Sequence, residues 1–65
     1  MIKYDLKKFL HENLTSIKTV SKETGIQEAT LYLTQKRGTI KPETLGMLVA
    51  KYPDAKLYII EEKRK

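Results

Sequence analysis

The chain has 65 residues, with 13 lysines and arginines against 8 aspartates and glutamates, and it has no cysteine. A chain of this length forms one small domain that buries only about 60% of the surface of its unfolded form. Little apolar material is then left to enclose a substrate pocket, so the composition argues against an enzyme. The absence of cysteine excludes disulfides and cysteine-rich zinc sites. A formal net charge of +5 favours a polyanionic partner.

The sequence shows no targeting segment and no catalytic or metal-binding cluster. No apolar run approaches the roughly 18 residues of a membrane span, and the lysine-rich start is unlike a signal peptide. The single histidine, His11, has no second ligand or nucleophile at a useful spacing. We therefore expect one cytoplasmic domain over residues 1–65, with no metal, no cofactor and no membrane partner.

Apolar spacing and sparse glycine and proline predict an all-α fold, a compact bundle of about five short helices. These helices are expected at about 5–12, 17–24, 27–36, 42–52 and 55–62. In the first, Leu6, Phe9 and Leu10 form an apolar stripe. Ser16 is the expected N-cap of the second, and Gly25 suits the left-handed residue that ends it.

The last two expected helices meet at Pro53. Proline tolerates the first helical position, so Pro42 begins the fourth helix, whose expected buried face consists of Leu45, Leu48, Val49 and Tyr52. Asp54 is the expected N-cap of the last helix, in which Leu57 and Ile60 lie on one side. Residues 57–60 also have strand propensity, although no second strand is evident in the sequence.

Residues 16–38 have the spacing of a helix-turn-helix unit. Such a unit needs a small residue in the first helix, a glycine four positions later and apolar residues that lock the pair. Ser21 and Gly25 meet the first two requirements. Val20, Ile26 and Leu31 meet the third.

At these residues the sequence resembles the lambda-repressor-like family of phage and bacterial regulators, the Cro and Xre type. Residues 20–26 (VSKETGI) resemble the family's turn core, and residues 36–45 (KRGTIKPETL) resemble the loop into its fourth helix. Residues 52–60 are similar to the start and core of the fifth. The resemblance implies a transcriptional regulator in a bacterial or phage-infected cell, most simply a small repressor that binds a near-palindromic double-stranded DNA operator as a homodimer.

Two positions depart from the family pattern. The family commonly has glutamine at the first residue of the second helix, where this chain has Ile17. It commonly has an apolar residue three positions after Leu31, where this chain has Thr34.

The front of the third helix is expected to enter a major groove. Glutamine can pair with adenine, glutamate can accept from a cytosine amine, and alanine can contact a thymine methyl. The candidate base-contacting residues are Gln27, Glu28, Ala29, Thr30 and Tyr32. The alternative is an ordinary solvated helix face.

Several polar residues are candidates for phosphate contacts that position the domain without reading sequence. They are Ser16, Lys18, Lys22, Lys36, Arg37, Thr39 and Lys41. The segment 36–41 is the strongest candidate, because it has three cations and no acid. The alternative for all these charges is simple solvation.

Apolar residues also favour a protein partner. Ala29, Tyr32, Leu33 and Lys36 share one side of the third helix, an unusually apolar side for a recognition helix. This side supports an alternative function, a modulator or antirepressor that binds a partner repressor, unless Leu33 is part of the core. Residues Tyr58, Ile59 and Ile60 are expected either at an interface with a second subunit or over the core of their own.

Overall fold

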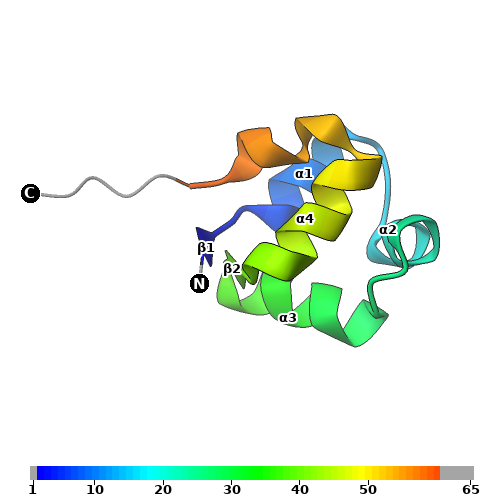
Figure 1. The fold of residues 1–65 in the computed structure, drawn as a ribbon, viewed down its shortest axis with the longest axis horizontal. Helices are drawn as coiled ribbons and strands as arrows, with labels where there is room; N and C mark the ends of the chain where they lie inside the picture. Colours follow the sequence, from blue (N-terminus) through cyan, green and yellow to red (C-terminus); the bar gives the residue numbers. More distant parts are fainter. Residues whose placement is uncertain (1, 61–65) are drawn as a thin grey trace, which may run out of the picture.

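The computed structural model describes residues 2–60 of the chain. In chain order its elements are β1 (Ile2–Lys3), α1 (Leu6–Glu12), α2 (Ile17–Thr24), α3 (Glu28–Arg37), β2 (Thr39–Ile40), α4 (Pro42–Lys51) and the 3-10 helix η1 (Pro53–Tyr58). The five helices pack into one globule, with α3 along its lower edge in Figure 1. The predicted all-α bundle of about five helices is confirmed, with the addition of a two-stranded sheet.

Local capping explains where the helices begin and end. Asp5 lies outside α1 as its N-cap, because its carboxylate accepts from the Lys8 amide at 3.0 Å. Gln27 occupies the N-cap position of α3 without a capping hydrogen bond from its side chain, and Gly38 ends the helix after Arg37 in the left-handed conformation. The observed α2 has the expected bounds.

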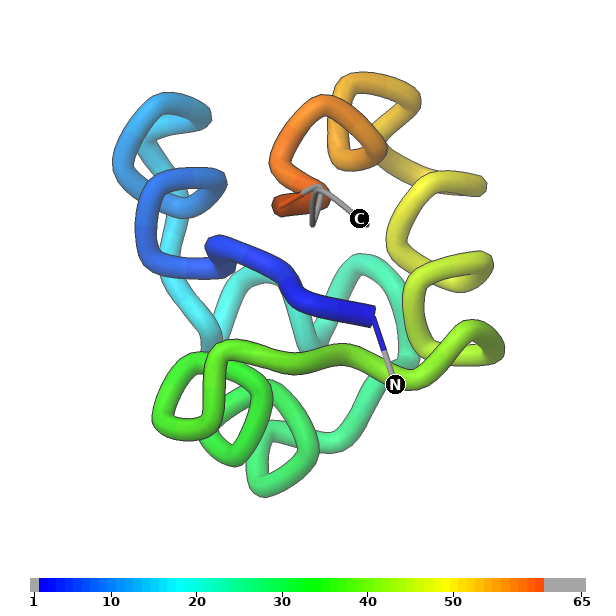
Figure 2. Tube along the Cα trace, turned by 90° about the vertical axis from the view of Figure 1, so that its left-hand side faces the viewer, coloured from blue at the N-terminus to red at the C-terminus, as the bar shows by residue number. Residues whose placement is uncertain are grey.

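The N-terminal segment pairs with two distant parts of the chain. β1 and β2 are antiparallel, with Ile2 opposite Ile40 and Lys3 opposite Thr39. On its other side, Tyr4 forms a bridge with Ile59. Figure 2 shows the blue N-terminal strand running between the green segment that contains β2 and the orange C-terminal segment. The sequence did not reveal this sheet, because strands of two residues carry no measurable alternation.

The fifth helix forms, but the expected bounds 55–62 are wrong, because it is a 3-10 helix over Pro53–Tyr58. The chain forms the 3-10 helix η1, which begins at Pro53 and not after an N-cap at Asp54. Ile59 is extended, and the Ile60 amide donates to the Lys3 carbonyl at 2.9 Å, so pairing with the N-terminal segment replaces further helical turns. Leu57 and Ile60, which were expected on one side of that helix, are 71% and 48% exposed. Residues 61 and 62 of the expected helix lie outside the described residues.

A single apolar core lies between the helices and the small sheet. Its fully buried side chains include Tyr4, Leu6, Phe9, Val20, Leu31, Ile40 and Leu48. Phe9 makes edge-to-face contacts with Tyr52 and Tyr58, at ring-centroid distances of 5.4 and 5.5 Å. The predicted buried face of α4 is confirmed: Leu48 is buried, while Leu45, Val49 and Tyr52 pack against the core.

The positive φ of 84° at Gly25 yields a stability prediction. We expect Gly25→Ala to lower the free energy of unfolding by about 1 kcal/mol, because a side chain disfavours this backbone conformation. A Cβ would meet no atom within 4 Å at either Gly25 or Gly46. Gly46→Ala, within α4, is therefore the matched control, and it should stabilise by about 1 kcal/mol. Urea unfolding followed by circular dichroism measures both; equal effects would contradict the prediction.

The buried phenol of Tyr4 yields a prediction for alkaline pH. Its hydroxyl donates to the Ala55 carbonyl at 2.7 Å, and burial raises the pKa of Tyr4 well above its ordinary value. Folded Tyr4 keeps its proton above about pH 10, where an unfolded tyrosine loses it. The stability that this group contributes is thus complete below pH 10 and falls as pH rises further.

The measurement compares wild type with Tyr4→Phe in urea at pH 7 and at pH 11. We expect the variant to be less stable at pH 7 by about 1 kcal/mol, because it lacks the hydrogen bond to Ala55. At pH 11 the difference should shrink. Burial raises the pKa of Tyr52 and a hydrogen bond to Glu12 raises that of Tyr58, but both effects are common to the two proteins. A difference that does not change with pH would refute the role of Tyr4.

Candidate nucleic-acid interface

The α2–turn–α3 unit is held together by hydrogen bonds around Gly25. Ser16 caps α2 by accepting from the Thr19 amide at 3.3 Å. At the other end, the Gly25 amide donates to the Ser21 carbonyl at 2.8 Å. Gly25 then turns the chain through its left-handed conformation, so that α3 begins three residues later.

Hydroxyl groups tie this turn to α2. The Ser21 hydroxyl donates to the Ile26 carbonyl, and the Thr24 hydroxyl accepts from the Ile26 amide at 3.2 Å. Val20, Ile26 and Leu31 are all buried beneath the turn. The residues that sequence spacing assigned to the turn and its apolar lock therefore lie together, and the hydroxyls of Ser21 and Thr24 are hydrogen-bonded.

Thr34 occupies a position that would suit an apolar side chain. It is only 5% exposed, and its hydroxyl donates to the Thr30 carbonyl at 3.0 Å. Such a bond within the helix satisfies the hydroxyl without a partner from elsewhere. The departure from the apolar pattern is accommodated by this local hydrogen bond.

The five candidate base-contacting residues do not all share one side of α3. Gln27 at the N-cap and Glu28, Ala29 and Tyr32 in the helix are exposed. Thr30 is partly buried and lines a pocket on the flank that faces α4. The structure thus presents four of these side chains to solvent and turns the fifth toward α4.

The seven candidate phosphate-contacting residues fall into separate groups. Ser16 at the N-cap of α2 is exposed, as are Lys18 and Lys22 within the helix. Lys36 is exposed near the end of α3. Arg37, Thr39 and Lys41 lie together around the pocket between α3, β2 and α4.

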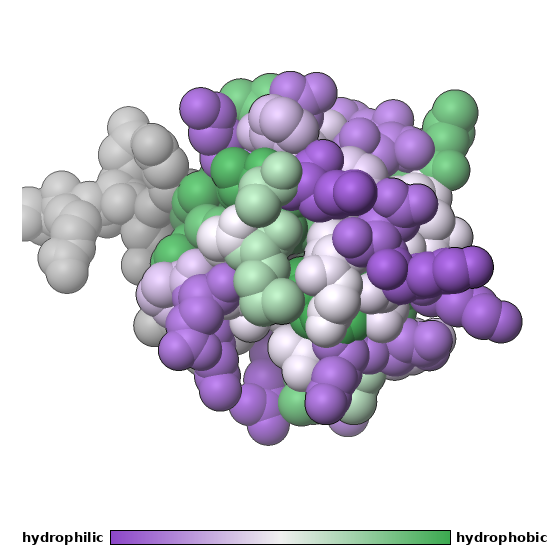
Figure 3. Space-filling view, turned by 45° about the vertical axis from the view of Figure 1, so that its right-hand side comes forward, coloured by the Kyte–Doolittle hydropathy of each residue, from purple (hydrophilic) through white to green (hydrophobic). Residues whose placement is uncertain are grey.

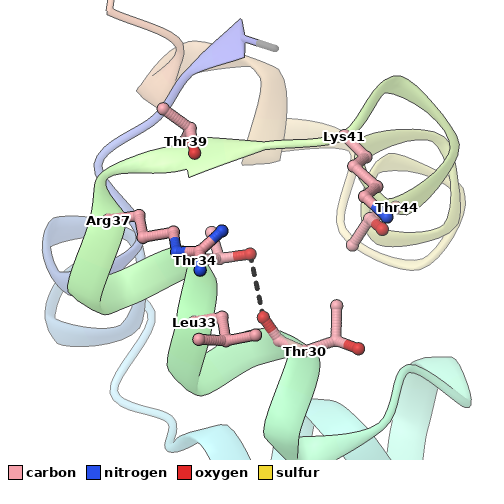
Figure 4. Close-up of a pocket in the computed structure, with 7 residues that line it drawn as sticks. All are labelled: Thr30, Leu33, Thr34, Arg37, Thr39, Lys41 and Thr44. Atoms are coloured by element: carbon pink, nitrogen blue, oxygen red, sulfur yellow. Dashed lines mark hydrogen bonds between the residues drawn. The ribbon is translucent and has the colours of Figure 1, made fainter.

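This pocket, called here the α3–α4 pocket, has a volume of about 150 Å³. Figure 4 shows its lining side chains converging from α3, from β2 and from the start of α4. They are Thr30, Leu33, Thr34, Arg37, Thr39, Lys41 and Thr44. Sequence reasoning missed Thr34 and Thr44 as members. The one usable signal for Thr44 is its place in the first helical turn after Pro42.

The chain matches no protein-family model, no curated protein and no solved structure.

Apolar side chains interrupt the polar surface of α3 and its surroundings. Tyr32 is 58% exposed and Leu33 is 48% exposed, so Leu33 is not part of the core. On the face in Figure 3, a band of apolar side chains crosses the middle of the molecule beside a larger hydrophilic area, above the lower edge at which α3 lies. Tyr58 and Ile59 pack against the core of their own chain, whereas Ile60 is exposed.

The described part of the chain has neither a metal-binding cluster nor a membrane-spanning helix. Within residues 2–60, no three histidine, cysteine, aspartate or glutamate side chains are placed to hold a metal ion. His11 is exposed. Over the same residues, no helix combines the length and the apolar character needed to cross a membrane.

Proposed function

We propose that this protein is a sequence-specific DNA-binding transcriptional regulator, a small repressor of the phage Cro kind that acts without catalysis. The observation that carries the proposal is the α2–turn–α3 unit. The hydroxyls of Ser21 and Thr24 hold its turn through hydrogen bonds to Ile26, while the front of α3 is exposed. In a helix-turn-helix protein the second helix enters the major groove with its first residues against base edges.

Each exposed group has a role that its chemistry supports. Gln27, Glu28 and Ala29 at the front of α3 contact base edges, and Tyr32 follows one turn later. Cations on both sides of α3 contact phosphates: Lys18 and Lys22 from α2, and Lys36 and Arg37 from the last turn of α3. The hydroxyl of Ser16, which caps α2, lies at a helix N-terminus that favours an anion.

The proposed regulator acts in the cytoplasm of a bacterial or phage-infected cell as a homodimer. Two copies would place their α3 helices about 34 Å apart, one turn of DNA, and would occupy an operator with two similar half-sites. Ile60, exposed beside the paired N-terminal segment, is available to a second subunit.

Selection of duplexes from a randomised pool, followed by affinity measurement at several salt concentrations, tests this proposal. We expect the selected duplex to bind more tightly than its scrambled version. Lys36→Gln with Arg37→Gln should weaken both duplexes and reduce the slope of log affinity against log salt by about 2, because two phosphate contacts are lost. Gln27→Ala should weaken the selected duplex alone, by about tenfold.

Lys7→Gln with Lys8→Gln is the matched control for the charge change. These two exposed lysines belong to α1, away from the front of α3, and their removal lowers the net charge by the same amount. The control should leave the salt slope within experimental error of wild type. Equal affinity for selected and scrambled duplexes at every salt concentration would eliminate sequence-specific reading.

The exposed apolar side of α3 supports a second function, a modulator or antirepressor that binds a partner repressor. Tyr32 and Leu33 expose about half of their surface on neighbouring positions of the helix. Large aromatic and apolar groups at the surface are typical of protein interfaces. Under this proposal α3 contacts protein and the cations only keep the domain soluble.

Tyr32→Ala with Leu33→Ala distinguishes the two functions. If α3 binds a partner repressor, this variant loses binding to that repressor, while Lys36→Gln with Arg37→Gln retains it. If α3 reads DNA, the alanine variant instead weakens the selected duplex, because Tyr32 lies beside the base-contacting residues. Duplex affinity is measured by fluorescence anisotropy and repressor binding by calorimetry. An alanine variant that binds both the duplex and the repressor as wild type does would contradict both proposed functions of α3.

A further inference from the structure

We propose that the α3–α4 pocket is a binding site for one phosphate-type oxyanion. Its lining includes two cationic side chains, Arg37 and Lys41, together with threonine hydroxyls and no carboxylate. The nearest acid in sequence, Glu43, is exposed and does not line the pocket. Arginine and lysine paired with hydroxyl donors form the usual surroundings of a bound phosphate.

The first turn of α4 adds backbone donors to this site. No side chain caps α4, and its first internal hydrogen bond runs from the Leu45 amide to the Lys41 carbonyl. The amides of Glu43 and Thr44 precede that bond and therefore have no acceptor within the helix. A helix N-terminus with free amides attracts an anion.

Thr44 provides an independent indication of a ligand. It is only 8% exposed, yet its side chain lines the pocket. Among the described residues, nothing forms a hydrogen bond with its hydroxyl. The Thr34 hydroxyl, in contrast, already donates to the Thr30 carbonyl. The Thr44 hydroxyl is therefore free to donate to an oxyanion in the pocket.

The pocket can also accommodate the ester group that carries a phosphate. Its volume of about 150 Å³ exceeds what a single water molecule needs. Leu33 provides one apolar wall, beside the hydrophilic cations. The ligand is thus a phosphate ester. It is either a phosphate of the DNA backbone or a free phosphate monoester, and both have the same chemistry.

Titration of the full chain with inorganic phosphate, without DNA, tests the site. Chloride at equal ionic strength is the reference, and amide shifts in the NMR spectrum are the readout. We expect saturable shifts at Thr39, Lys41 and Thr44 with phosphate only. Thr44→Val and, separately, Lys41→Gln should lower phosphate affinity by about tenfold, because each removes one charge-assisted donor.

Lys51→Gln is the matched control, since Lys51 carries the same charge in the last turn of α4 and does not line the pocket. It should change phosphate affinity by less than twofold. If Thr44→Val does not fold, Lys41→Gln, at an exposed position, provides the same test. The proposal would be overturned by shifts that do not saturate, by equal shifts with chloride, or by a Lys51→Gln variant that weakens phosphate binding as much as Lys41→Gln does.

A second arm of the experiment, with DNA present, identifies the source of the phosphate. Only this arm rests on the proposed function. Phosphate replaces chloride at constant ionic strength while the selected duplex is bound. Two results together assign the pocket to a backbone phosphate. Phosphate displaces the duplex, and the double variant Arg37→Gln with Lys41→Gln loses more duplex affinity than the double variant Lys51→Gln with Lys56→Gln. Phosphate binding without displacement assigns it to a free monoester. Failure of DNA binding leaves the first arm unaffected.

Discussion

Tyr4 makes the contacts on which the arrangement of the other elements depends. Its amide donates to the Gly38 carbonyl at 2.8 Å, and its hydroxyl donates to the Ala55 carbonyl at 2.7 Å. Its backbone also bridges to Ile59. One buried residue near the start of the chain therefore connects the end of α3 with η1 and with the extended segment that follows it. A small domain has few such long-range contacts, so each contributes much to its stability.

This connection also positions the surface around α3. The Gly38 carbonyl belongs to the residue that ends α3, and β2 follows it directly. The end of the helix, Thr39 and Lys41 are therefore held in place by the N-terminal strand, while the Gly25 turn holds the beginning. Both ends of α3 are fixed by backbone and hydroxyl groups. Its side chains are left to serve a binding role, whether the partner is DNA or protein.

The predictions from sequence succeeded where the signal was local. Ser16, Gly25, Gly38 and Pro42 each mark a helix end through their own backbone preference, and the observed helices begin or end beside them. The end of the fifth helix was mispredicted because Ile59 is held by Tyr4, which is distant in the sequence. The sheet and the α3–α4 pocket were missed for the same reason.

The candidate site was predictable only in part. Arg37, Thr39 and Lys41 were identified from the charge of their segment, and they do lie together. Thr34 was noticed only as a departure from an apolar pattern, and Thr44 was not noticed at all. Their association depends on how α3 packs beside α4, which no spacing within either helix encodes. The position of Thr30 in the lining of the pocket follows from that same packing.

The burial pattern of α3 has a consequence for how freely its sequence can vary. Only Leu31 and Thr34 among its residues are buried, and the remaining positions contribute little to the core. Substitutions along the exposed side therefore leave the scaffold intact while changing the shape and polarity that a partner meets. A lineage of such chains can diversify in what it binds, one surface residue at a time, without passing through unfolded intermediates.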